Sequence, residues 1–464
     1  MKDGDGAFEP NEALAARWVL PVSEPPIADG VVVFRGGTIE RVTTREEFLK
    51  QNPAANLTDY GDAIIMPGLV NLHTHLDYTA LRAFDTQSDF FSWIRGLAGR
   101  AFRWSLDEWR SSALAGAHEI LLSGTTCIAD SSYSGATAWA VARTGLRAVV
   151  ALEVFGVNVG RAEEQWNGWL ERFAALAEGG DPDIEAAVAS GRLTLTVSPH
   201  APYTVCPPLW RRAADWALSR RLPILCHISE SAAECRWFAG GCAELDDFLV
   251  EMVPGSVDGG PQALTWKGEG RSPVAHLEKH KLLNERTVSA HSVKLGKADM
   301  KIFKKRGVKV AHCPRSNSRL RCGIAPLPEM LAAGLTVGFG TDSAASGDDL
   351  DVLSEARFAT SLRRALAPDF TLTPAQMVRM LTLDGAAALG LDDRIGSLTP
   401  GKQADLAVFE IAGPVGYALN SPHDLLIYGG SRLRDLYVDG SRLVADGVVN
   451  GVESRVPSPR FPGS

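Results

Sequence analysis

Short apolar runs alternate with longer amphipathic segments through the middle of this chain. The apolar runs cover residues 63–72, 125–130, 147–155, 193–199, 222–226, 287–290, 308–311 and 335–340. Segments with helical spacing of apolar residues lie between them, for example at 106–122, 161–178, 207–220, 297–306, 324–333 and 349–365. Eight such alternations predict an α/β fold, a (β/α)₈ TIM barrel whose short parallel strands are buried by helices.

The two ends of the chain differ from the middle, because short β-like pieces are separated there by turn residues. Pieces at 16–21, 30–35 and 38–42 have counterparts at 404–410, 435–440 and 443–445. Chain termini often lie close together, so we expect both ends to form one small composite β-sandwich, with two independent β appendages as the alternative. The predicted domains are residues 1–62 and 396–464 for the two halves of the sandwich and 63–395 for the barrel.

A glycine-rich stretch at 240–275 interrupts the alternation. Residues 244–251 have the pattern of one helix, and we expect this insertion to lie over the mouth of the barrel. Long loops in compact domains are usually functional or mobile. The first dozen residues and the tail from about residue 452 are expected to be disordered.

Composition narrows the class of protein. The chain has 464 residues, 45% of them hydrophobic, and a net charge of −8 with dispersed Lys and Arg, so we expect neither a nucleic-acid nor a membrane partner. Seven cysteines without a Cys-x-x-Cys pair, and an N-terminus unlike a signal peptide, indicate a reduced protein in the cytoplasm. The expected partner is a small-molecule substrate, and both a monomer and a homodimer stay open.

Histidines and acidic residues stand where the apolar runs end. His73 and His75 close the first run, and both imidazoles can reach one ion because residues two apart in a strand share a face. The later runs lead to His200, to His227 with Glu230, to His291, to His312 and to Asp342. The C-terminal ends of barrel strands meet at one face, so we expect these side chains to converge.

Each of these residues also has an ordinary structural explanation. A lone histidine at a strand end is more often a hydrogen-bonded residue, Asp342 alone could cap a helix, and Glu230 could sit in the first turn of one. Together, however, nitrogen and oxygen donors on successive strands favour one divalent ion that turns a bound water into a nucleophile. The other histidines, His118, His276, His280 and His423, are predicted to lie at the surface.

Several of these motifs resemble the amidohydrolase superfamily. They are residues 67–75 (PGLVNLHTH), 198–204 (SPHAPYT), 227–230 (HISE), 290–291 (AH), 312–317 (HCPRSN) and 340–343 (GTDS), and residues 396–409 are similar to the return strand of that superfamily's sandwich. More narrowly, the set resembles the aminohydrolases that act on heterocycles. That branch includes guanine, methylthioadenosine/adenosylhomocysteine, aminodeoxyfutalosine and triazine enzymes.

The resemblance implies a metal centre. Its ligands would be His73, His75, His227 and Asp342, a donor set that suits Zn²⁺ or Fe²⁺. Relatives with two ions use a carboxylated lysine on the fourth strand. No lysine lies between 193 and 200, so one divalent ion is expected.

The resemblance also implies roles in catalysis. Asp342 and His291 would orient the attacking water, and Glu230 would carry a proton to a ring nitrogen of a cyclic amidine that loses ammonia. His200 is expected to hydrogen-bond the substrate.

The segment after the first strand bears on the substrate. Residues 89–95, with Trp93, resemble a stretch of aminodeoxyfutalosine deaminases, menaquinone-pathway enzymes that turn an adenine base into hypoxanthine. Trp93 could stack on a purine or simply pack within its loop. The methylthioadenosine/adenosylhomocysteine enzymes carry a glutamate for ribose hydroxyls where this chain has Phe102.

Three arginines, Arg82, Arg315 and Arg319, could meet an anionic substrate group. Arg315 is the leading candidate for gripping the benzoate of aminodeoxyfutalosine, and pairing with a structural carboxylate is its alternative.

The sequence therefore predicts 6-amino-6-deoxyfutalosine deaminase activity. The alternatives are a methylthioadenosine/S-adenosylhomocysteine or guanine-type deaminase and a chlorotriazine-type hydrolase. An inactive barrel that serves as a scaffold is a remote alternative, because such relatives usually lose ligands and here none is missing.

Overall fold

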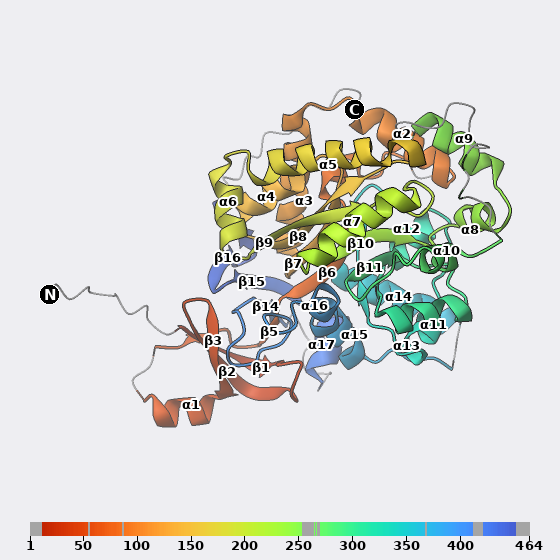
Figure 1. Cartoon of the computed structure of the whole chain (residues 1–464). Coiled ribbons are helices and arrows are strands. Elements are labelled where there is room, and N and C mark those ends of the chain that lie inside the picture. Colours follow the sequence, from red (N-terminus) through yellow and green to blue (C-terminus); the bar gives the residue numbers. More distant parts are fainter. Residues whose placement is uncertain are drawn as a thin grey trace.

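The protein consists of a barrel and a separate sheet built from the two ends of the chain (Figure 1). The computed structural model describes residues 12–53, 56–85, 88–252, 264, 266, 270–366, 369–411 and 421–451. Figure 1 shows red N-terminal strands and blue C-terminal strands side by side at the lower left of the barrel. The predicted α/β barrel with a β-structure from both chain ends is confirmed.

The barrel strands follow one another in sequence order and are all parallel. They are β6 (Leu69–Thr74), β7 (Thr125–Ser132), β8 (Arg147–Val154), β9 (Leu193–Pro199), β10 (Ile224–Ile228), β11 (Thr287–His291), β12 (Lys309–His312) and β13 (Val337–Phe339). Every residue of β6, β7 and β8 is buried, as expected for strands covered on both faces. A parallel bridge between Thr74 and Asp342 joins the first strand to the end of the last one and closes the barrel.

Helices cover the barrel and begin where their sequences provide caps. They are α2 (Phe90–Ala101), α3 (Leu106–Leu122), α4 (Ala136–Thr144), α5 (Ala162–Ala177), α6 (Pro182–Ala189), α7 (Pro207–Ser219), α8 (Ala232–Ala239), α9 (Ala243–Met252), α10 (Pro273–Lys279), α11 (Lys297–Arg306), α12 (Pro314–Arg319), α13 (Leu327–Ala332), α14 (Val352–Leu366), α15 (Pro374–Leu381) and α16 (Leu383–Leu389). The Ser105 side chain accepts from the Glu108 backbone N–H at the start of α3, and the Glu108 carboxylate accepts from the Ser105 N–H in return. Such a box satisfies two backbone donors that a helix start leaves open.

The second sheet has nine strands from both ends of the chain. They are β1 (Glu12–Val19), β2 (Ile27–Arg35), β3 (Thr38–Thr44), β4 (Thr58–Asp59), β5 (Ala63–Pro67), β14 (Leu406–Glu410), β15 (Arg432–Val438), β16 (Ser441–Ala445) and β17 (Val448–Val449), with α1 (Arg45–Gln51) and α17 (Pro422–Tyr428) beside them in sequence. Phe34 of β2 and Tyr437 of β15 pack edge to face at 5.9 Å although three strands separate β2 from β15 in the sheet. The sheet therefore folds over on itself as a sandwich does.

One expected strand is two. The run at 63–72 divides at Gly68 into β5, which pairs with β1 and β14, and β6, which begins the barrel. A side chain at Gly68 would collide with the side chain of Thr126, because an added Cβ would lie 2.1 Å from it. The domain limits at 62 and 395 stay a prediction, and the sheet membership of β5 favours a first limit near Gly68.

A buried ion pair ties the barrel to the sheet. Arg147, at the start of β8, donates from Nε to Asp405 Oδ2 at 2.8 Å and from Nη2 to Asp439 Oδ1 at 2.6 Å. Both carboxylates belong to the C-terminal part of the chain. Breaking one partner of a buried pair is costly, so this contact holds the two sheets in a defined relation.

Several smaller expectations have different outcomes. The helix predicted at 244–251 is α9, while residues 253–263 of the same insertion and the expected disordered ends at 1–11 and 452–464 lie outside the described residues. His276 was expected at the surface, but it is buried against Phe238 with 4.8 Å between the ring centroids. Among the helices that the structure describes, none combines the length and the apolar character of a membrane-crossing helix. The cytoplasmic location and the choice between monomer and homodimer stay predictions.

Candidate metal centre and substrate cavity

Five of the predicted site residues meet at the C-terminal face of the barrel. His73 and His75 come from the end of β6, His227 from β10, His291 from the end of β11 and Asp342 from the turn after β13. The ring centroid of His73 lies 4.8 Å from that of His75, 4.9 Å from that of His227 and 5.2 Å from that of His291. All five side chains are buried.

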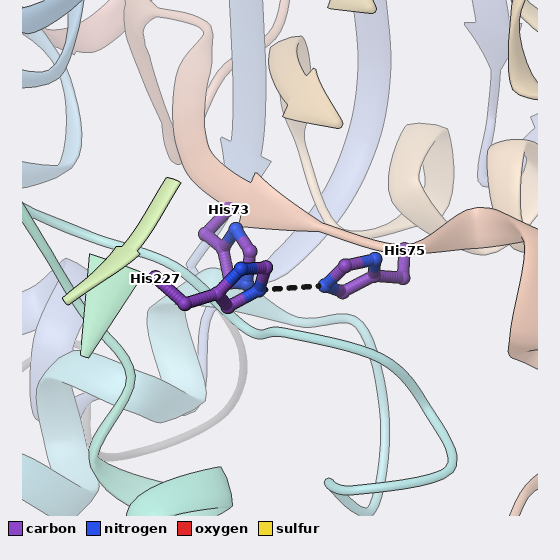
Figure 2. Close-up of side chains that lie close together, drawn as sticks. All are labelled: His73, His75 and His227. Carbon is purple, nitrogen blue, oxygen red and sulfur yellow. Dashed lines mark hydrogen bonds between the residues drawn. The ribbon is translucent and has the colours of Figure 1, made fainter. Parts of the chain in front are cut away.

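The nitrogen atoms of three imidazoles converge, as Figure 2 shows for His73, His75 and His227. The Nε2 atoms of His75 and His227 are 3.2 Å apart, and Asp342 Oδ1 lies 3.6 Å from Nε2 of both His73 and His75. His227 Nδ1 donates to the carbonyl of His200 at 2.8 Å, so its Nε2 carries the free lone pair. His73 Nε2 is buried without a hydrogen-bond partner. These donors therefore fit a divalent ion such as Zn²⁺ or Fe²⁺.

Burial keeps the imidazoles neutral. Burial, and then the neighbouring imidazoles, lower the pKa of His73 and of His227 well below the ordinary value. Burial alone would raise the pKa of Asp342, but its interactions with the nearby imidazoles and its hydrogen bonds from Ser316 and Ser346 hold it below its usual range. Neutral imidazoles next to a carboxylate are the protonation states that bind a cation.

The backbone at the centre is strained. His291 and Asp342 have φ angles of +65° and +60°. These angles lie in the left-handed region, which residues other than glycine rarely adopt. The Asp342 N–H donates to the carbonyl of His73 at 2.8 Å, so closure of the barrel supports this conformation. A Cβ at Gly340 would lie 2.7 Å from His73 Cβ, so only glycine lets the last strand approach the first. Strain of this kind commonly gathers at functional sites.

Glu230 lies beside the centre and next to His291. Its Oε1 is 3.6 Å from His291 Nε2, and burial raises its pKa to about 7 although His291 acts in the opposite direction. Glu234 accepts from the backbone N–H of Glu230 at 2.8 Å and so holds the turn that carries it. A carboxyl with a pKa near the working pH is suited to give and take protons.

A cavity with mainly aromatic walls opens onto the centre. Its described lining comprises His75, Tyr78, Phe90, Trp93, Ile94, Leu97, Ala98, Phe102, Tyr133, Glu153, Phe155, His200, Tyr203, Thr204, His227, Glu230, Phe248, Met252, His291, Leu320, Asp342 and Ser343. Trp93 of α2, Phe102 directly after α2 and Phe248 of α9 are part of this wall, and the place of the insertion over the mouth of the barrel stays a prediction. His200 and Trp93 both line this cavity, and their contact with a substrate stays a prediction.

Arg315 is not in the cavity wall. Its guanidinium donates from Nε to Glu355 at 2.5 Å and from Nη2 to Asp349 at 2.8 Å, which is the structural pairing that the sequence left as the alternative. Arg82 pairs with Glu119 and Arg319 with Asp348. The described lining contains no Arg or Lys, so none of the three arginines supplies the expected contact to an anionic group.

The sequence reasoning missed two buried acidic residues at this face. Glu153 lies near the end of β8 and Asp130 within the last residues of β7. Burial, followed by the charge of Asp77, raises the pKa of both carboxyls, that of Asp130 to about 7. A signal was present, because each is an acidic residue at the end of an otherwise apolar run, the same feature that identified Asp342.

Asp130 holds the residues on both sides of His75, one of the predicted metal ligands. Its Oδ2 accepts from Thr74 Oγ1 at 2.7 Å and from the Leu76 N–H at 2.8 Å, the two residues that flank His75. Asp130→Ala should therefore weaken metal binding by about 10–100-fold, as loss of an outer partner does. Competition with a chelator of known affinity measures this change. Asp130→Asn keeps an acceptor oxygen and should have a smaller effect, whereas unchanged affinity in Asp130→Ala would remove the positioning role.

The sequence matches the amidohydrolase family over residues 64–452, so the chain belongs to that family and is a hydrolase. The 5-methylthioadenosine/S-adenosylhomocysteine deaminase of Moorella thermoacetica is 32% identical over 94% of both chains. Among solved structures, an adenosine deaminase from Xanthomonas campestris with bound zinc has a TM-score of 0.77 and 26% identity, covering 95% of this chain and 94% of that one. The atrazine chlorohydrolase of Arthrobacter aurescens, at 24% identity and a TM-score of 0.78 over 95% and 97% of the two chains, shares the fold.

Proposed function

We propose that this protein hydrolytically deaminates the base of an adenine-type nucleoside and releases ammonia. The observation that carries the proposal is Glu230, a buried carboxyl with a pKa near 7 that lies 3.6 Å from His291 beside a cluster of metal-binding side chains. The deaminases of nucleosides among the relatives, including the one from Moorella thermoacetica, support it.

His73, His75, His227 and Asp342 would hold one divalent ion, and zinc is favoured because the Xanthomonas campestris relative contains it. When bound, such an ion lowers the pKa of water from 15.7 to about 7 and so supplies a nucleophile at neutral pH.

The protein's own groups then move the protons. Glu230 takes a proton from the attacking water and delivers it to the ring nitrogen next to the attacked carbon, so the new C–O bond forms as the ring loses its aromaticity. The second proton of the water, now on the hydroxyl of the attacked carbon, passes to the exocyclic amine. The C–N bond then breaks, ammonia leaves with the electron pair, and the C–O bond becomes the carbonyl of the product. His291 donates Nδ1–H to Asn317 at 2.9 Å, which orients its Nε2 toward the reacting atoms. His200 donates or accepts through Nε2, because its Nδ1 bonds Thr204 at 2.8 Å.

The favoured substrate is 6-amino-6-deoxyfutalosine. Phe102 is part of the cavity wall at the position where the methylthioadenosine/adenosylhomocysteine enzymes carry their ribose-binding glutamate. Phe90, Trp93 and Phe248 offer an aromatic surface on which a benzoate ring can stack. The engagement of Arg315 elsewhere weakens this choice. The sequence relatives favour methylthioadenosine or adenosylhomocysteine as the second candidate.

A coupled ammonia assay over a defined panel tests the proposal. The panel contains aminodeoxyfutalosine, methylthioadenosine, adenosylhomocysteine, adenosine and guanine. A chlorotriazine is added to the panel, and its hydrolysis is measured as released chloride. We expect the best adenine nucleoside to reach a kcat/KM of at least about 10⁴ M⁻¹ s⁻¹, the lower end of ordinary enzyme efficiency. Ammonia release confined to guanine, chloride release alone, or silence from metal-loaded protein would each contradict the proposal.

A further inference from the structure

Glu153 is a buried carboxyl that faces the cavity and has no role in the reaction as described above. It is 3% exposed, it is one of the cavity-lining residues, and its Oε1 has no hydrogen-bond partner. One of its carboxyl oxygens lies within 4.8 Å of a ring nitrogen of His200 and of one of His227. The group is therefore placed where the reacting heterocycle must sit.

The protein does little to compensate for this burial. After burial, the largest charge effects on Glu153 come from the acidic Asp77 and Asp130, then from the cation Arg172 and from Asp342. The Arg172 guanidinium donates to the backbone carbonyl of Glu153, at 3.3 Å, and to that of Tyr133. A buried polar group without a partner is unfavourable, so a carboxyl kept in this place indicates a partner that arrives with the ligand.

A role as a ligand of a second ion does not fit. Glu153, His200 and His227 could in principle hold a cation together. His227, however, has only Nε2 free, because its Nδ1 donates to the His200 carbonyl at 2.8 Å. That Nε2 lies 3.2 Å from Nε2 of His75 and belongs to the first donor group. One lone pair cannot bind two ions.

Glu153 and Glu230 lie on different flanks of the centre. The strand order is β11-β10-β9-β8, with Glu153 on β8 and Glu230 just after β10, beside His291 of β11. The attacked carbon has two neighbours in the ring. If one of them, the ring nitrogen, meets Glu230, the side of the ring that carries the other neighbour faces β8. In an adenine base, that side carries N7.

We propose that Glu153 is a specificity-determining residue whose protonated carboxyl donates a hydrogen bond to N7 of the substrate base, on the side of the attacked carbon opposite to Glu230. This inference rests on the proposed function, because it uses the orientation that deamination requires. The contact between Glu153 and N7 selects purines over heterocycles that have no hydrogen-bond acceptor on that side. A site built to hydrogen-bond one substrate atom discriminates strongly against analogues that lack it.

The test compares adenosine with 7-deazaadenosine, in which carbon replaces N7. Adenosine serves as the reference because every adenine nucleoside carries the same base. Wild-type protein should prefer adenosine by about tenfold in kcat/KM, the value of one buried hydrogen bond. Glu153→Leu should lose activity on adenosine but not on the analogue, so that the preference falls below about twofold. Glu153→Gln retains a donor and should keep the preference.

Controls separate this role from a structural one. Phe155→Leu alters the cavity wall without removing a hydrogen bond and should change both nucleosides alike. Metal content should be unchanged in both Glu153 variants, and loss of metal would make Glu153 a ligand. A Glu153→Leu protein that keeps the tenfold preference, or that loses both activities equally, would overturn the inference.

Calorimetric binding keeps this result separate from the proposed function. If the wild-type protein binds both nucleosides but deaminates neither, the proposed reaction fails while the ratio of the two affinities still reports on Glu153. If neither nucleoside binds, both proposals are overturned.

Discussion

Glu230→Gln is expected to lose most turnover while the fold and the metal remain. The amide has the same size as the carboxyl but cannot accept and release a proton near pH 7, where burial places the pKa of Glu230. General acid–base help of this kind contributes about 10²–10⁴-fold, so kcat on the best panel substrate should fall by that factor. Steady-state kinetics with measured metal occupancy checks the result.

The control for this variant is Glu185→Gln, which changes an exposed carboxyl of α6 that is not among the described cavity-lining residues. It should leave kcat unchanged. If Glu230→Gln keeps more than about a tenth of the wild-type kcat, the loss is smaller than a positioned acid–base group produces. Another residue then carries the proton.

His73→Ala should lose the metal and, with it, the activity. The change removes a buried nitrogen that no protein group pairs with and leaves Asp342 without one of its two close imidazoles. Loss of an outer partner already costs about 10–100-fold in metal affinity, and loss of a ligand should exceed that. Elemental analysis after dialysis gives the metal per chain.

His118→Ala, in α3 outside the site, should bind metal like the wild type. Because removal of a buried ring can also unfold a protein, His227→Ala serves as a second ligand variant, and circular dichroism reports the fold of both. Full metal occupancy in a folded His73→Ala protein would remove His73 from the ligand set.

The strand-end histidines were predictable for a simple reason. In a parallel barrel every strand ends at the same face, so a polar residue that closes an apolar run is placed there whatever the rest of the chain does. His73, His227 and His291 follow this rule, and Asp342 follows it one turn beyond β13. The division of the run at 63–72 was not predictable from apolar character, because β5 and β6 are equally buried although they belong to different sheets.

The arginines show where such reasoning stops. The guanidinium of Arg315 begins about four bonds from the backbone, at the end of a flexible side chain. The position of Arg315 along the sequence therefore does not decide which carboxylate this group meets. Glu355 and Asp349, which it pairs with, lie 40 and 34 residues further along the chain. Only the packing of α12 against α14 brings them into reach.

By itself, the sequence determined the barrel, the joining of the two chain ends and the gathering of His73, His75, His227, His291 and Asp342 at one face, because these follow from periodicity and from strand direction. Only the tertiary structure decided the contents of the cavity wall, where Glu153 lacks a partner and Arg315 is absent. It also decided the left-handed backbone at Asp342 that the bridge to Thr74 supports. Such features depend on contacts between residues distant in the chain, which no local pattern encodes.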